Sequence, residues 1–96
     1  METVKSQTSH LCEKYNVRRL DVFGSVARGS DSNRSDIDFL VEFNNPELAA
    51  SSRYFGLLFD LESTLERPVD LLTTGSLKNS YFRQRVLSER ITIYER

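Results

Sequence analysis

The chain has 96 residues, with 13 basic and 14 acidic side chains and a formal net charge of -1. This length allows one domain, residues 1–96, and the balanced charge excludes a general attraction to nucleic acid or to membrane surfaces. The single cysteine, Cys12, excludes an internal disulfide framework and favours a reducing compartment. Neither a signal peptide nor an apolar run of about 20 residues is present in the sequence, so we expect a cytoplasmic protein.

The first half of the chain alternates between predicted helices and strands. Apolar residues at helical spacing predict a helix over residues 2–15. Alternation of apolar and polar residues predicts a strand over Val17–Phe23, and Gly24–Gly29 is predicted to turn into a short helix. A polar loop, Ser30–Arg34, leads into the clearest strand, Ile37–Phe43.

The second half continues the alternation. A long helix is expected over Leu48–Glu66, and Pro68 prevents its continuation. Val69–Thr73 is predicted to be a third strand, Leu77–Leu87 a helix, and Ile91–Tyr94 a short final strand. This order predicts a small α/β or α+β domain, in which helices flank a short mixed sheet.

Three aspartates are candidates for a metal site. Asp36 and Asp38 are two residues apart on a predicted strand, so their carboxylates leave the same face. Asp70 lies between apolar residues of another predicted strand, where an acidic side chain is uncommon unless it is paired or has a function. If the two strands are neighbours, the three carboxylates converge. Mg²⁺ prefers such oxygen ligands, and one or two ions could be held there.

A candidate phosphate-binding segment precedes these acids. Gly24 follows a strand directly, where glycine lets the backbone approach a ligand closely, and Ser25 adds a hydroxyl donor. Arg28 and Arg34 could add positive charge near the same phosphates. A phosphate cradle beside metal-binding acids is what phosphoryl or nucleotidyl transfer requires, because its catalysis is mostly positioning and charge neutralisation.

This combination resembles the signature of the DNA polymerase β-like nucleotidyltransferase superfamily: Gly-Ser at 24–25, ten further residues, and Asp-Ile-Asp at 36–38. The string GSVARGSDSNRSDIDFLV resembles the minimal nucleotidyltransferase (MNT) branch, and Asp70 in VDLL matches the third acid of that family. The resemblance covers essentially the whole chain and implies a polymerase β-like core. It implies that Gly24 and Ser25 bind the triphosphate, that Asp36 and Asp38 bind metal, and that Asp70 completes the site.

The chain is similar in size to MNT antitoxins, which are encoded with HEPN-domain ribonuclease toxins. The resemblance therefore implies a Mg²⁺-dependent transfer of AMP from ATP to a tyrosine of a HEPN toxin. Two other functions remain open, namely an antitoxin that inhibits its partner by binding alone, and a transferase acting on a small molecule or an RNA end. The intact acids favour an enzyme over a pure binder, and the absence of a second domain in the sequence disfavours the third function.

Some of these residues have simpler interpretations. Arg28 could instead pair with Asp31 at the surface. The basic C-terminal stretch is either a solvated helix face or a contact for the partner or the nucleotide; it comprises Lys78, Arg83, Arg85 and Arg90. The predicted helix over Leu48–Glu66 carries more apolar side chains than one core face needs, which indicates a protein interface.

Overall fold

A computed structural model of the chain describes residues 2–29 and 36–96. Four strands form one mixed sheet: β1 (Val17–Phe23), β2 (Ile37–Phe43), β3 (Val69–Thr73) and β4 (Ile91–Glu95). Their order in the sheet is β3-β2-β1-β4. β1 is antiparallel to β2 and β4, whereas β2 and β3 are parallel. The predicted mixed sheet is thus confirmed, and the predicted loop that ends at Arg34 lies outside the described residues.

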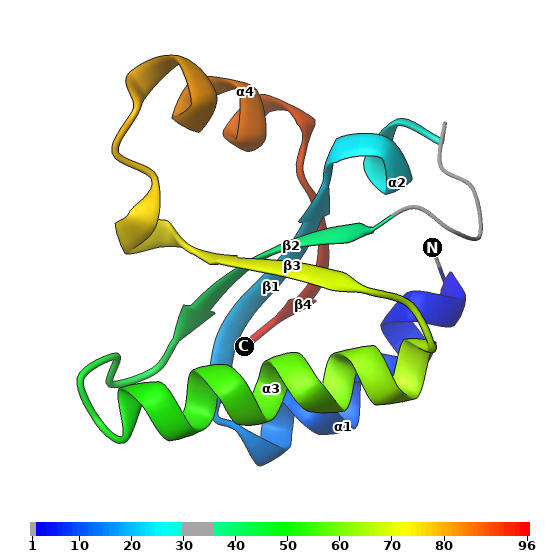
Figure 1. Ribbon diagram of the computed structural model, residues 1–96, viewed down its shortest axis with the longest axis vertical. Coiled ribbons are helices and arrows are strands. Elements are labelled where there is room, and N and C mark those ends of the chain that lie inside the picture. Colours follow the sequence, from blue (N-terminus) through cyan, green and yellow to red (C-terminus); the bar gives the residue numbers. More distant parts are fainter. Residues whose placement is uncertain (1, 30–35) are drawn as a thin grey trace.

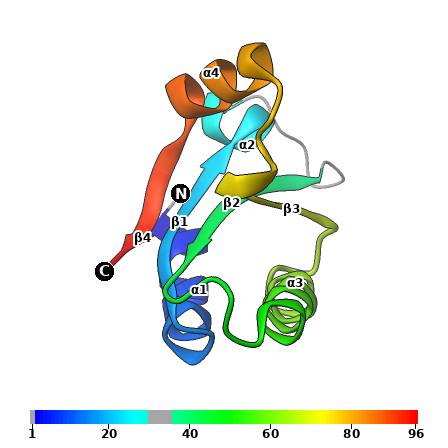
Figure 2. The same ribbon diagram turned by 90° about the vertical axis from the view of Figure 1, so that its left-hand side faces the viewer.

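Helices lie on both sides of this sheet (Figures 1 and 2). α1 (Glu2–Lys14) and α3 (Ala50–Leu65) contact each other and pack against one face. α4 (Ser80–Glu89) lies at the other face and is preceded by a short 3₁₀ helix, η1 (Thr74–Ser76). α2 (Gly24–Arg28) contacts α4 at the end of the sheet, and its Val26 and Ala27 pack against the same hydrophobic cluster as α1 and α3. Within the described ranges, no helix is both long and apolar enough to cross a membrane.

The pleat of β2 sends its side chains into two different hydrophobic clusters. Ile37, Phe39 and Val41 are buried in the larger cluster, together with residues of α1 and α3. Leu40 points to the other face, where it packs with Phe23 and residues near α4 in a smaller cluster. This alternation is the one predicted from the sequence, because successive side chains of a strand face opposite ways.

The long helix begins two residues later than predicted, at Ala50 rather than Leu48. Ala49 adopts a left-handed conformation with φ 49°, and the backbone N–H of Leu48 closes a turn on Asn45 O. Arg53 stabilises this turn, because its guanidinium donates to backbone oxygens of five residues: Tyr15, Asn16, Asn44, Asn45 and Leu48. The helix start is therefore set by contacts between distant segments.

The C-terminal helix is also shifted, from the predicted Leu77–Leu87 to Ser80–Glu89. Leu77 is drawn into the smaller hydrophobic cluster before the helix starts. The side chain of Asn79 then caps the helix by accepting a hydrogen bond from the backbone N–H of Phe82 at 3.0 Å. Asparagine is a favoured N-cap residue, so Asn79 sets the start of the helix locally. The pattern of apolar residues, which predicted an earlier start, does not show this cap.

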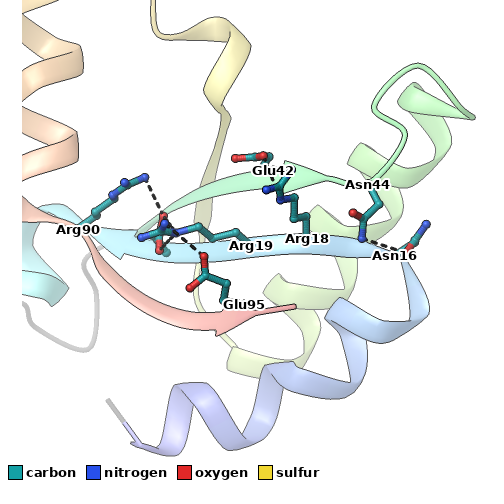
Figure 3. A network of polar contacts seen from close by, with 8 residues as sticks. Asn16, Arg18, Arg19, Glu42, Asn44, Arg90 and Glu95 are labelled. Carbon is teal, nitrogen blue, oxygen red and sulfur yellow. Dashed lines mark hydrogen bonds and ion pairs between the residues drawn. The ribbon is translucent and has the colours of Figure 1, made fainter.

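A polar network joins β1 to the chain segment between α4 and β4 (Figure 3). Asp21 of β1 is 1% exposed and forms ion pairs with Arg19 at 3.0 Å and with Arg90 at 3.5 Å. A buried carboxylate is costly unless it is paired and hydrogen-bonded. Arg90 directly follows α4, so its pairing with Asp21 fixes the end of that helix above the sheet.

Candidate active site

Two of the predicted site acids lie side by side in the sheet. β2 and β3 pair in parallel, and their register places Asp38 opposite Asp70. Asp36 comes directly before β2 and is exposed. The condition set by the sequence, that the two acid-bearing strands are neighbours, is therefore met for Asp38 and Asp70.

The electrostatics of Asp38 reflect this crowding. The pKa of its carboxyl is raised, first by burial and then by the negative charges of Asp70 and Asp36, while the positive charge of Arg28 acts in the opposite direction. Folding thus holds together like charges that repel one another. A divalent cation is the species that such a cluster would bind most favourably.

The donor set fits Mg²⁺ only as part of a larger coordination shell. Across residues 2–29 and 36–96, no three or more Asp, Glu, His or Cys side chains are arranged to hold a metal by themselves. Mg²⁺ is commonly held by one or two carboxylates together with water and substrate phosphates, and Asp38 with Asp70 supplies such a pair. The role of Asp36 as a further ligand remains a prediction.

Gly24 brings the chain against these carboxylates. Its φ is 71°, and a Cβ at this position would overlap Oδ2 of Asp38. Only glycine allows both the positive φ and this close approach. Ser25 follows directly, so the Gly-Ser pair is positioned beside the acids as the sequence predicted.

The Gly-Ser pair, Asp38 and Asp70 line one cavity of about 330 Å³, which lies at the end of the sheet between α2 and α4. α2 and the segment before it contribute Phe23, Gly24, Ser25 and Arg28; the strands contribute Asp38 and Asp70; and α4 contributes Phe82, Arg85, Val86 and Glu89. The residues from α4 were not among the predicted site residues. The basic stretch of the sequence contained Arg85, but only the fold shows which way it faces.

Arg28 reaches the cavity but is paired with Glu89, from which its Nη1 lies 3.2 Å away. Glu89 also lies 3.5 Å from Nε of Arg85. The alternative partner considered from the sequence, Asp31, lies outside the described residues, as does Arg34, the second arginine predicted to bind nucleotide. Glu89 is therefore a site residue that the sequence did not indicate.

A larger hollow of about 1290 Å³ opens between the loop after β2, the start of α3, the end of β3 and α4. Its lining includes Tyr54, Phe55, Arg83 and Arg90, but none of the Gly-Ser pair or the site aspartates. We place the chemistry in the smaller cavity because the acids and the Gly-Ser pair meet there.

The profile of the family described as "Nucleotidyltransferase domain" matches residues 4–93, nearly the whole chain. The chain belongs to this family. The nucleotidyltransferase domain is 35% identical over 92 residues to a Methanocaldococcus jannaschii protein provisionally named a protein adenylyltransferase; the match covers 96% of this chain and 92% of that protein. It is 39% identical over 69 residues to the protein adenylyltransferase MntA of Thermococcus cleftensis, covering 72% of this chain and 68% of that protein.

Solved structures show the same fold. The nucleotidyltransferase domain matches a structure described as a minimal nucleotidyltransferase with a TM-score of 0.79 and 33% identity, covering 94% of this chain and 89% of the other. It matches a toxin–antitoxin structure with AMP-PNP with a TM-score of 0.72 and 21% identity, covering 96% of this chain and 73% of the other. It also matches a complex of a tri-AMPylated Shewanella oneidensis HEPN toxin with an MNT antitoxin. This match has a TM-score of 0.66 and 19% identity, and it covers 99% of this chain and 72% of the other.

Proposed function

We propose that this nucleotidyltransferase domain is a Mg²⁺-dependent protein adenylyltransferase that uses ATP to modify a tyrosine of a HEPN-type toxin, and thereby acts as its antitoxin. The observation that carries the proposal is the pairing of Asp38 with Asp70 in a cavity that is also lined by Gly24 and Ser25. The names of the relatives support the reaction class, and the MNT–HEPN complex of the same fold supports the kind of partner.

In the proposed reaction, the tyrosine oxygen attacks the α-phosphorus of ATP in line and forms a new P–O bond. The bond from the α-phosphorus to the oxygen that bridges it to the β-phosphate breaks, and pyrophosphate leaves. Asp70 accepts the tyrosine proton as general base or, as a metal ligand, helps to lower the pKa of the hydroxyl. Bound Mg²⁺ supplies neutralisation of the phosphate charge.

The remaining roles follow the chemistry of each side chain. Gly24 and Ser25 bind the triphosphate, since their backbone and hydroxyl line the cavity next to Asp38. Asp38 and Asp70, with Asp36 as a further ligand, would hold Mg²⁺ through hard carboxylate oxygens. Arg28 binds a phosphate through its guanidinium, which suits phosphate geometry. Arg34 is assigned the same role from the sequence alone.

The surface of α3 supports a protein as the acceptor. Phe55 and Phe59 are 51% and 62% exposed, and their rings stack 6.4 Å apart between centroids. Leu48, before the helix, is 62% exposed. Exposed aromatic side chains that pack against each other are typical of a protein interface. A large partner also provides acceptor contacts that one small domain does not.

Mass spectrometry of the co-expressed partner tests the proposal. We expect AMP on a partner tyrosine with the wild-type domain and none with Asp70→Asn. Glu42→Gln is the matched control, because Glu42 lies on the same face of β2 as Asp38 but lines only the larger hollow. Inhibition of an unmodified partner that survives Asp36→Asn with Asp38→Asn would establish the binding-only antitoxin. AMP found on RNA or a small molecule instead would establish the third function.

A further inference from the structure

α4 carries two arginines that face different hollows, although only one residue separates them. Arg83 lines the larger hollow, and its Nη1 donates to the backbone oxygen of Thr74 at 3.4 Å. Arg85 lines the cavity that contains Asp38 and Asp70. The two side chains have the same chemistry and lie on one helix. Substituting each in turn therefore distinguishes the effect of position from the effect of losing a positive charge.

Glu89 bridges two arginines across the cavity. Its carboxylate accepts hydrogen bonds from Arg28 Nη1 at 3.2 and 3.3 Å, and Arg85 Nε lies 3.5 Å from Oε1. Glu89 and Arg85 lie one turn apart on α4, so the pair that Glu89 forms with Arg28 is the one that joins α2 to α4. The arginine side chains are 45% and 67% exposed. Such exposed ion pairs are weak, and a more highly charged anion can displace them.

The charges that line the cavity indicate why Arg85 matters. The described lining residues include three acids, Asp38, Asp70 and Glu89, and two cations, Arg28 and Arg85. Without Arg85, a single arginine would face three carboxylates and an incoming triphosphate. Guanidinium groups bind phosphate through paired, charge-assisted hydrogen bonds, which are stronger than those to a neutral donor such as serine.

We infer that Arg85 is a second phosphate-binding residue of this site, and that Glu89 holds Arg28 and Arg85 near the cavity until the phosphates of a nucleotide replace its carboxylate. This inference rests on the proposed function and adds α4 to the nucleotide-binding machinery. In the free protein, Glu89 links α2 to α4. When nucleotide is bound, its phosphates take over this link.

Calorimetry with ATP and Mg²⁺ tests the inference on the intact chain. Arg85→Ala is expected to raise the Kd for ATP about tenfold, the loss typical of one charge-assisted hydrogen bond at a partly exposed site. Arg83→Ala, the matched control, is expected to leave the Kd unchanged. Arg85→Lys should restore part of the affinity, and thermal melting of each variant confirms that the fold is kept.

Glu89→Gln provides a second, independent measurement. The amide keeps the shape but not the charge, so both arginines are released and the Kd for ATP is expected to fall a few-fold. Arg85→Ala should then cost more affinity in the Glu89→Gln background than in the wild type. The larger cost of Arg85→Ala in that background is the deciding result, because removal of a negative charge beside the phosphates tightens ATP binding by itself.

The outcomes separate this inference from the proposed function. If Arg85→Ala and Arg83→Ala both bind ATP like the wild type while AMP transfer proceeds, the role of Arg85 is wrong and the proposed function stands. If Arg85→Ala alone weakens ATP binding but no AMP reaches the partner, the inference holds and the proposed function fails. A wild-type domain that binds no ATP would overturn both.

Discussion

The two faces of the sheet are built for different purposes. The face covered by α1 and α3 is closed: Leu57 and Leu61 of α3 are fully buried against Phe39 and its neighbours. The face toward α4 has only a small cluster, and the cavity with Asp38 and Asp70 lies beside it. One face therefore supplies most of the hydrophobic stabilisation, while the other tolerates charges and open space that a packed core would exclude.

β2 connects the two faces within a single strand. Phe39 anchors the closed face, while Asp38, the preceding residue, faces the cavity. Because side chains alternate, the packing of Phe39 fixes the position of Asp38 without contact between their side chains. Precise placement of charged groups in this small domain therefore depends on the packing of the opposite face.

Removing a side chain from the closed face should have the largest effect on stability. Leu61→Ala leaves a cavity in the larger cluster, so we expect the free energy of unfolding to fall by about 2–5 kcal/mol. Phe59→Ala on the same helix is the control, because Phe59 is 62% exposed and should contribute much less. Urea unfolding measures both variants. Equal losses would mean that the two faces of α3 are not distinguished by burial.

A change on the open face should separate activity from stability. Asp38→Asn is expected to reduce AMP transfer by about 10²–10³-fold, because it removes charge from the proposed binding site for phosphate and metal. The same change should raise the melting temperature, since the raised pKa of Asp38 shows that folding disfavours its ionised form. A variant that loses activity and stability together would contradict this separation.

Much of the fold was predictable from local signals. The bounds of β1, β2 and β3 were predicted correctly, because alternation is clear in β2 and partial in β1, and because Gly24, Pro46, Pro68 and Gly75 interrupt the chain near the strand ends. The start of α3 was predicted wrongly, because the left-handed conformation of Ala49 depends on hydrogen bonds from Arg53 to segments far along the chain. Such contacts leave no periodic pattern in the sequence.

The site shows the same limit. The parallel neighbours Asp38 and Asp70 follow from the strand pattern once the two strands pair. Arg85 and Glu89 belong to the cavity only because α4 folds back over the sheet beside α2. The sequence marked the basic stretch as a possible contact, and helical spacing points Arg83 and Arg85 about 200° apart. Only the fold shows which hollow each of them lines.

A smaller change at the contact of α1 with α3 tests how tightly the closed face is packed. A Cβ on Gly56 would lie 2.7 Å from Cε1 of Tyr15 and 2.9 Å from its hydroxyl oxygen. We expect Gly56→Ala to destabilise the domain by about 1 kcal/mol, because overpacking exceeds the gain in helix propensity. Gly75→Ala, beside the larger hollow, meets no atom within 4 Å and should change stability by less than about 0.5 kcal/mol. Thermal melting distinguishes them, and equal shifts would contradict the steric argument.

The smallest effect concerns pH, and it should have opposite signs on the two sides of the sheet. Hydrogen bonds from Tyr15 at 2.6 Å and Lys14 at 3.0 Å lower the pKa of Asp60 on α3. Its contribution to stability is therefore present above the unfolded pKa of about 3.9 and lost as the pH falls through the lower folded value. The raised pKa of Asp38 acts the other way, because its penalty disappears as the pH falls from the raised folded value toward about 3.9. Urea unfolding across this acid range should show less acid destabilisation for Asp60→Asn than for the wild type, and more for Asp38→Asn. If both variants changed the pH dependence in the same direction, the two faces would not differ electrostatically in the way that their contacts indicate.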